Sequence, residues 1–74
     1  MQLTVKLFAY FRDNRFKIEA RRLAPGTTVG DIVDSLGIAR DEVGVLMINS
    51  RHTTFATCPA EGDILAIFPM IGGG

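Results

Sequence analysis

The sequence has one cysteine among its 74 residues, no net charge, and no apolar run near the ~18 residues that a membrane span would need. The single cysteine, Cys58, has no partner for an internal disulfide, which indicates a reducing compartment, most simply the cytoplasm. The start of the chain does not resemble a signal peptide, because Lys6 interrupts its apolar residues and no small-residue cleavage site follows. The composition therefore predicts a cytoplasmic protein that does not associate with a membrane.

The charges are unevenly distributed along the chain although they sum to zero. Six of the eight basic residues lie before residue 26, and six of the eight acidic residues lie after it. A basic first third is compatible with nucleic-acid binding. These basic residues alternate with apolar ones, however, as they would on the outer face of a half-buried strand. We therefore expect a solvated hairpin in this region and no nucleic-acid partner.

The length and apolar content indicate one small folded domain. A chain of 74 residues lies near the lower limit of independent folding, and its 47% apolar content is too high for a disordered chain. The sequence contains no internal repeat and no linker. We assign residues 1–71 to a single domain and residues 72–74 to a flexible glycine tail.

Two alternating segments open the chain and predict a hairpin of two strands. Residues 3–10 alternate, with Leu3, Val5, Leu7 and Ala9 on one face and Thr4, Lys6, Phe8 and Tyr10 on the other. Residues 12–15 form a polar turn, and residues 16–20 alternate again. Pro25-Gly26 then interrupts the pattern.

A change of period after this point predicts one short helix. Its apolar stripe is Val29, Ile32, Val33 and Leu36, at the spacing of a single helix face. Thr28 is the expected N-cap, and Asp31 stands three residues later in capping-box position. Gly37 is expected to end the helix, with Ile38 folding back as the apolar contact of a Schellman cap.

The second half of the chain predicts three more strands and gives the order β-β-α-β-β-β. They are residues 45–48, 52–57 and 64–68, the last ended by Pro69, and a polar connector at 40–44 precedes the first of them. We therefore expect an α+β fold in which one main helix packs on one face of a mixed sheet. The expected core consists of Leu3, Val5, Leu7, Ile18, Leu46, Ile48, Leu65 and Ile67 from the strands, and Val29, Ile32, Val33 and Leu36 from the helix.

One helix can cover only one face of the sheet, so the other face is left open. The side chains expected on this outer face are those of Phe8, Tyr10, Met47, Ile64, Ala66 and Phe68. An exposed apolar patch of this kind usually marks a partner site. The alternative is a second small core covered by a loop.

The sequence ends with Gly72, Gly73 and Gly74, and we expect this segment to carry the function. At an average glycine usage of about 7%, three consecutive glycines occupy a given place in roughly 0.03% of chains. Glycine leaves a terminal carboxylate on a thin thread with no side chain to obstruct it. Residues 64–71 form the most apolar stretch and run into the glycines without a polar linker, which argues against the alternative of a frayed tail.

Several residues could suggest other chemistry, but their surroundings in the sequence argue against it. Cys58 could hold a persulfide, yet no cationic residue or helix start lies next to it in the sequence to favour that chemistry. His52 has no cysteine, histidine or carboxylate at metal-ligand spacing, so we expect no metal site. Asp31 and Asp34 lie on the solvent side of the helix, and no glycine-rich loop opens a helix to cradle phosphate.

Three motifs of the sequence form a recognisable set. They are the helix segment 27–38, the pair Ile48-Asn49, and Gly62-Asp63 followed by the apolar strand and the end Phe68-Pro69-Met70-Ile71-Gly72-Gly73-Gly74. Together they resemble the motifs of the ubiquitin-like sulfur carriers, which include the small subunit of molybdopterin synthase and the thiazole-forming sulfur carrier of thiamine biosynthesis. The resemblance covers essentially the whole chain and implies a ubiquitin-like β-grasp fold. The opening residues 6–12 look more like the molybdopterin branch.

The chain also departs from the pattern of these carriers in two places. The synthase subunits commonly carry two prolines where this chain has Pro69-Met70, and a small residue such as alanine or serine where it has Gly72. Both departures weaken the choice of subfamily, and neither blocks chemistry at the chain end.

The resemblance implies a carrier protein and not an enzyme, with no bound cofactor. A partner adenylyltransferase of the ubiquitin-activating type would use ATP to adenylate the Gly74 carboxylate, which becomes a thiocarboxylate, and Gly73 would help it to enter a narrow channel. The sulfur would pass to a synthase subunit similar to the large subunit of molybdopterin synthase. The expected partner-binding residues are Phe8, Tyr10, Met47, Ala66, Phe68, Pro69, Met70, Ile71 and Gly72.

Three alternatives remain open from the sequence. The sulfur could serve thiazole formation or another metabolite instead of molybdopterin or tungstopterin. Gly74 could instead become amide-linked to lysines, as in a protein modifier. The chain could also be a small binding module that uses the face around Phe8 and Phe68, for example on single-stranded nucleic acid.

Overall fold

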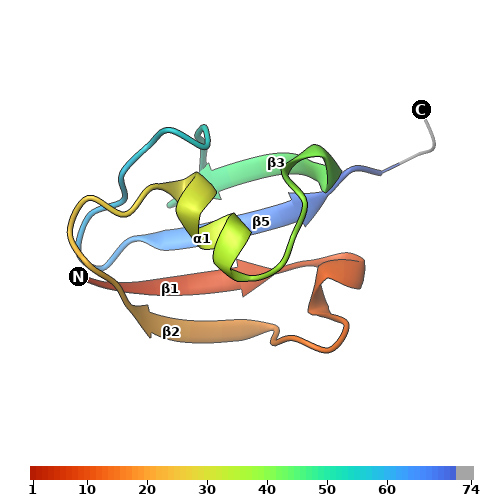
Figure 1. Ribbon diagram of the computed structural model, residues 1–74, viewed down its shortest axis with the longest axis horizontal. Helices are drawn as coiled ribbons and strands as arrows, with labels where there is room; N and C mark the ends of the chain where they lie inside the picture. Colours follow the sequence, from red (N-terminus) through yellow and green to blue (C-terminus); the bar gives the residue numbers. More distant parts are fainter. Residues whose placement is uncertain (72–74) are drawn as a thin grey trace.

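The computed structural model describes residues 1–71, and the expected glycine tail at 72–74 lies outside the described residues (Figure 1). The domain contains five strands, one α-helix and two short 3₁₀ turns. In chain order the elements are β1 (Gln2–Leu7), η1 (Ala9–Arg12), β2 (Ile18–Arg22), α1 (Val29–Ser35), η2 (Arg40–Glu42), β3 (Val43–Ile48), β4 (Arg51–His52) and β5 (Ile64–Pro69).

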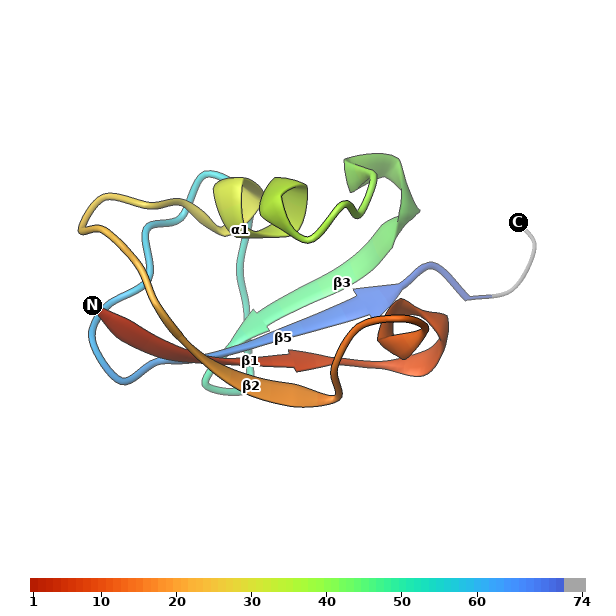
Figure 2. The same ribbon diagram turned by 60° about the horizontal axis from the view of Figure 1, so that its bottom comes forward.

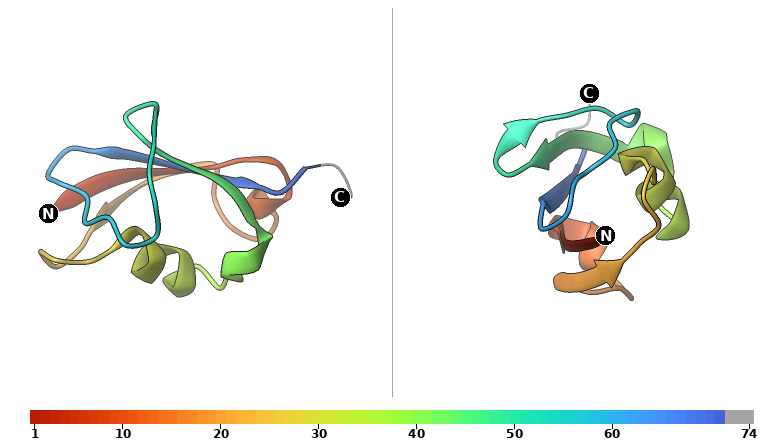
Figure 3. Two further views of the ribbon diagram at one scale, coloured as in Figure 1. Left: turned by 90° about the horizontal axis from the view of Figure 1, so that it is seen from above. Right: turned by 90° about the vertical axis from the view of Figure 1, so that its left-hand side faces the viewer.

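All five strands form one mixed sheet in the order β2-β1-β5-β3-β4. β5 is parallel to β1 and antiparallel to β3, and the two outer pairs are antiparallel hairpins. α1 lies across one face of this sheet, as Figures 2 and 3 show from two sides. The predicted α+β architecture, a β-grasp with one helix on one face, is therefore confirmed. None of the helices in residues 1–71 is long and apolar enough to cross a membrane.

The core lies between α1 and the sheet, and most of the predicted core residues are in it. Each fully buried side chain of this kind contributes roughly 1.5–3 kcal/mol to folding. Ile48 and Leu36 are only partly buried against this cluster. The buried residues are Leu3, Val5, Leu7, Phe11, Val29, Ile32, Val33, Ile38, Leu46, Leu65 and Ile67.

The first hairpin differs from its prediction. β1 ends at Leu7 because Ala9 adopts a left-handed conformation (φ +51°) and starts η1, so Ala9 leaves the core face and Phe11 becomes buried. The second strand also starts later than predicted, at Ile18. Ile18 pairs with Lys6 and therefore points to the outer face, where 55% of it is exposed. Its assignment to the core was wrong.

The strand predicted at residues 52–57 is also shorter than expected. Only Arg51–His52 pair with β3, and the chain then leaves the sheet. Asn49 and Ser50 make the tight turn between these strands, both with positive φ (51° and 67°), as in a type I′ turn.

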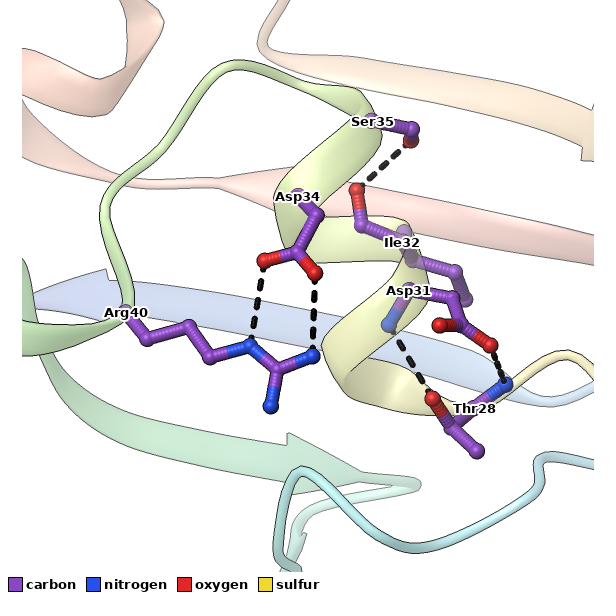
Figure 4. Close-up of polar contacts among 6 residues, drawn as sticks. All are labelled: Thr28, Asp31, Ile32, Asp34, Ser35 and Arg40. Atoms are coloured by element: carbon purple, nitrogen blue, oxygen red, sulfur yellow. Dashed lines mark hydrogen bonds and ion pairs between the residues drawn. The ribbon is translucent and has the colours of Figure 1, made fainter.

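Both predicted caps of α1 are present. The Thr28 hydroxyl accepts a hydrogen bond from the Asp31 main-chain N–H, and the Asp31 carboxylate accepts one from the Thr28 N–H, each at 3.0 Å (Figure 4). At the other end Gly37 has a φ of +73°, and its N–H donates to the Asp34 carbonyl. The N–H of the buried Ile38 donates to the Val33 carbonyl at 3.3 Å, which completes a Schellman motif.

Two arginines hold α1 in place through contacts that the sequence did not reveal. The Arg15 guanidinium donates to the carbonyls of Leu36 and Gly37, so the first hairpin is tied to the end of the helix. Arg40 pairs with both oxygens of the Asp34 carboxylate, at 3.0 and 2.9 Å (Figure 4). The same guanidinium packs against Gly30, where an added Cβ would come within 2.5 Å of its Nη2, so a side chain at this position would displace the end of Arg40.

The Thr28 cap leads to a stability prediction. Replacement by alanine removes the acceptor for the Asp31 N–H and should lower the free energy of unfolding by about 1 kcal/mol, measured by urea denaturation. Ser35→Ala is the matched control, because its hydroxyl donates to the Ile32 carbonyl within the helix and alanine favours helix. The role of the cap is contradicted if both variants unfold at the same urea concentration.

The Asp31 carboxylate leads to a second prediction, on pH. Hydrogen bonds from the main chain and side chain of Thr28 lower the pKa of Asp31 below its ordinary value. The unfolded chain therefore takes up a proton at Asp31 before the folded one does, so this stabilisation is present at neutral pH and is lost as the pH falls through the lowered pKa. In acid titrations of the melting temperature, Asp31→Asn should show a shallower decline than the wild type. If the melting temperatures of Asp31→Asn and the wild type declined in parallel with falling pH, the stabilising role of the Asp31 carboxylate would be contradicted.

Candidate functional site

The outer face of the sheet, opposite α1, carries an apolar cluster centred on two stacked phenylalanines. The rings of Phe8 and Phe68 lie 4.1 Å apart between centroids and are nearly parallel, with an interplanar angle of 10°. The Arg12 guanidinium covers the Phe8 ring from 5.3 Å, and its Nε donates to the Leu7 carbonyl at 2.7 Å. The position of Phe8 is therefore fixed from both sides, which reduces the entropy it would lose on contact with a partner.

A hollow of about 200 Å³ opens on this face beside the two phenylalanines. Strand register places the small side chain of Ala66 between Lys6 and Met47, so Ala66 leaves room in the middle of the face. The residues that line the hollow, which we call the outer hollow, are Lys6, Phe8, Met47, Asn49, Ser50, Ile64, Ala66 and Phe68. The predicted residues Phe8, Met47, Ala66 and Phe68 are thus brought together.

Four lining residues of the outer hollow were not among the predicted partner contacts, and of these Ile64 was expected on the outer face. Lys6 was placed on this face by its alternation with Leu7, but it was not assigned a role. Asn49 and Ser50 reach the hollow because the tight turn after β3 is placed beside β5. The sequence alone does not indicate which strand lies beside this turn.

Lys6 is the one charged residue in the lining of the outer hollow. Among the strand residues whose register places them on the outer face, the charged ones are Lys6 and Arg22, and none is a carboxylate. The Asp63 carboxylate lies next to the hollow, because it accepts a hydrogen bond from the lining residue Asn49 at 2.9 Å. Lys6 is therefore the group in the lining that can pair with a carboxylate of a partner.

Tyr10 does not lie on the outer face, contrary to its prediction. It belongs to η1, where it is 47% exposed, and its hydroxyl donates to the Glu42 carboxylate at 3.4 Å. Partial burial and then the neighbouring Glu42 carboxylate raise the pKa of Tyr10 above its ordinary value. Because the Glu42 carbonyl also accepts from the Met70 N–H at 2.9 Å, Tyr10 stands at the end of the sheet where β5 finishes.

The end of β5 carries the last described residues of the chain, next to η1 and η2 (Figure 1). Pro69 was predicted to contact a partner, but it is buried in this structure and therefore not accessible to one. Met70 and Ile71 are 64% and 85% exposed. Two large apolar side chains are therefore presented to solvent directly after the central strand. The predicted site residues Gly72, Gly73 and Gly74 lie outside the described residues.

The motif residues that carried the family resemblance hold the scaffold. The Asn49 amide donates to the Asp63 carboxylate at 2.9 Å and accepts from the Ile64 N–H at 3.0 Å. The second oxygen of Asp63 accepts from the Ala60 N–H at 2.8 Å. These bonds fix the turn after β3 to the loop before β5, and Gly62 adopts a φ of +83° within that loop. The motif therefore sets the start of the strand that precedes the tail.

The residues set aside in the sequence show no cluster suited to chemistry. Cys58 is exposed, with its Sγ 3.6 Å from the Gly26 carbonyl. A larger hollow of about 320 Å³ lies along the edge of β3, and His52 is its one ionisable lining residue. Within residues 1–71 no group of three or more histidine, cysteine or carboxylate side chains could hold a metal ion.

Solved structures of other proteins share this fold over almost the entire chain. SAMP1 from Haloferax volcanii is 24% identical, with a TM-score of 0.76 and full coverage of both chains. A second Haloferax volcanii protein, HVO 2177, is 29% identical, with a TM-score of 0.81 and coverage of 100% of this chain and 87% of that one. A protein named as molybdopterin converting factor subunit 1 from Pyrococcus furiosus is 22% identical, with a TM-score of 0.77 and coverage of 96% and 99%.

A more distant likeness is to a complex of subunits 1 and 2 of molybdopterin-converting factor from Helicobacter pylori, at 14% identity, a TM-score of 0.66 and full coverage of both chains. These likenesses establish the ubiquitin-like fold. No curated protein sequence matches the chain. The model of the family described as Mut7-C ubiquitin, however, matches residues 2–72. Because that match spans nearly the whole sequence, the chain belongs to the Mut7-C ubiquitin family.

Proposed function

We propose that this protein is a sulfur carrier whose Gly74 carboxylate is adenylated and converted to a thiocarboxylate, and that the sulfur serves molybdopterin or tungstopterin assembly. One observation supports this most strongly. The central strand β5 contributes Ala66 and Phe68 to the outer hollow and then passes directly into the exposed Met70 and Ile71. A partner docked on the outer face is thereby placed next to the path of the tail.

The proposed chemistry takes place at the end of the main chain. A carboxylate oxygen of Gly74 attacks the α-phosphorus of ATP, a new P–O bond forms, and pyrophosphate leaves. Sulfide then attacks the acyl carbon and displaces AMP, which leaves the sulfur in a thiocarboxylate. A persulfide donor would also need a thiol to cleave the acyl disulfide that it forms. The carrier supplies the reacting carboxylate, and the partner enzyme supplies the catalytic groups.

We expect the outer face to provide most of the energy of binding to the partner. An extended segment from Phe68 to Gly74 can reach about 20 Å. Ordering its main chain inside a partner channel costs roughly 1–2 kcal/mol per residue. Burial of Phe8, Phe68 and Met47 against a partner would offset that cost. Burial of Met70 and Ile71 in an apolar channel would also favour binding.

Two partners follow from this proposal. One is an adenylyltransferase of the ubiquitin-activating type, which uses ATP. The other is a sulfur-accepting synthase subunit, and its support comes from the Helicobacter pylori neighbour, whose structure is a complex of the two subunits of a molybdopterin-converting factor. Lys6 in the lining of the outer hollow suits a carboxylate on either partner.

A second candidate function is protein modification, in which Gly74 becomes amide-linked to lysines of other proteins. It is favoured by the likeness to SAMP1, another solved structure of which is described as Haloferax volcanii small archaeal modifier protein 1. Adenylation of Gly74 would be common to both functions. They differ in the group that attacks the activated carbonyl, which is sulfur in a carrier and a lysine amine in a modifier.

The intact mass of the protein isolated from its own cells tests the proposal. A carrier should include a fraction heavier by the difference between one sulfur and one oxygen atom, and fragmentation should place that difference at Gly74. A variant lacking Gly73 and Gly74 is the control and should lack this fraction. Lysine adducts in place of the heavier fraction would favour the modifier function instead. Wild-type function in the truncated variant would contradict both.

Phe68 leads to a prediction on docking. Phe68→Ala removes one ring of the stacked pair and should weaken binding to the activating enzyme by about 2 kcal/mol, or roughly thirtyfold in Kd, measured by titration calorimetry. Ile18→Ala is the matched control, because Ile18 is exposed on the same face but does not line the outer hollow. Loss of the folded state in Phe68→Ala, seen in thermal melting, would show that Phe68 acts in folding and not in docking.

A further inference from the structure

The last residues of β5 pass over an irregularity in β3. Val43 pairs with Pro69 and Val45 pairs with Phe68, so Gly44 is an additional residue opposite the end of β5. Such a bulge bends the strand that contains it and redirects the neighbouring chain. In this fold the neighbouring chain is the segment that leads into the tail (Figure 2).

The main chain at the end of β5 approaches Gly44 so closely that no side chain would fit there. A Cβ at this position would lie 2.8 Å from the Pro69 carbonyl oxygen, 2.9 Å from the Met70 Cα and 3.0 Å from the Met70 nitrogen. All three are main-chain atoms, so rotation of a side chain cannot relieve the overlap. By contrast, a Cβ at Gly30 would meet the end of the Arg40 side chain, and one at Gly26 would meet nothing within 4 Å.

A second contact holds the same point of the chain. The Met70 N–H donates to the Glu42 carbonyl at 2.9 Å, two residues before Gly44. Residues 42–44 therefore fix both the distance and the direction of the main chain at Met70. Beyond this point Ile71 is 85% exposed. These are the last main-chain restraints in the described residues before the glycines.

We propose that Gly44 is a positioning residue for the adenylation described above: the absence of a side chain sets the direction in which the main chain leaves the sheet at Met70. This inference rests on the proposed function. When the outer hollow is docked on the activating enzyme, the direction of the main chain at Met70 decides where the Gly74 carboxylate meets the α-phosphorus of ATP. Displacement of reacting groups by about 1 Å can lower a rate by about a hundredfold.

The test compares Gly44→Ala with Gly26→Ala in pyrophosphate exchange catalysed by the activating enzyme of the source organism. Gly26 has a φ of +89°, so alanine strains the main chain there without touching the tail. Gly44→Ala should lower kcat by about tenfold to a hundredfold, with KM for the carrier within about threefold of the wild type. Gly26→Ala should leave both constants unchanged while lowering the melting temperature. Equal kinetics in the two variants would overturn the inference.

Hydrogen exchange at the Met70 amide tests the exit geometry without a partner. The Met70 amide should exchange at least about tenfold faster in Gly44→Ala than in Gly26→Ala. The reason is that the Cβ added at position 44 would overlap the main chain at residues 69 and 70 and so separate Met70 from the Glu42 carbonyl. Equal protection would overturn the positioning role. If Gly44→Ala does not fold, the wild type provides the test. Its Met70 amide, which donates to the Glu42 carbonyl, should exchange at least about tenfold more slowly than its Ile71 amide. Equal exchange of the two amides would overturn the inference.

The failure of the proposed function can be told apart from the failure of this inference. If the wild-type protein supports no pyrophosphate exchange and carries no thiocarboxylate, the proposed function is wrong and the positioning role falls with it. If the wild type reacts and Gly44→Ala behaves as Gly26→Ala does, the proposed function stands and only the role of Gly44 is wrong.

Discussion

The position of β5 between β1 and β3 is the constraint on which the rest of the structure depends. Hydrogen bonds to both neighbouring strands hold β5 in place. Its successive side chains point alternately to the core and to the outer face. Leu65 and Ile67 are buried under α1, while Ala66 and Phe68 lie on the outer face. The strand that is best anchored in the fold is therefore also the strand that continues into the tail. Under the proposed function, this strand couples docking on the outer face to delivery of the chain end.

Part of the sequence that carries the family resemblance stabilises the fold and does not line the outer hollow. The capping pair of α1 and the Asn49–Asp63 bond fix loops and turns, and they contribute nothing to the outer hollow except through Asn49. Their effect on function is indirect, because they decide where β5 begins and how α1 lies on the sheet. The outer hollow is lined instead by alternate residues of three strands, a pattern that many sequences share. This explains why the fold is easier to identify from the sequence than the partner is.

The sequence predicted those features that depend on neighbouring residues. The apolar stripe and caps of α1 are local signals, and the alternation along β1 and β5 placed Phe8 and Phe68 on one face. Ile18 was misplaced because the register of a hairpin depends on the conformation of its loop, and Ala9 gives no sign of its positive φ. The close approach of Met70 to Gly44 could not be predicted at all, since the two lie far apart in the chain and meet only in the folded sheet.

In this account the globular domain binds the partner and the chain end reacts. Semi-synthetic protein with a carboxamide in place of the Gly74 carboxylate separates these two properties, because it changes the reacting group and leaves the outer face intact. We expect this protein to bind the activating enzyme with wild-type affinity in titration calorimetry and to form no acyl-adenylate with ATP. If the amidated protein still supports the full biological activity, the reacting atom lies elsewhere and the account is contradicted.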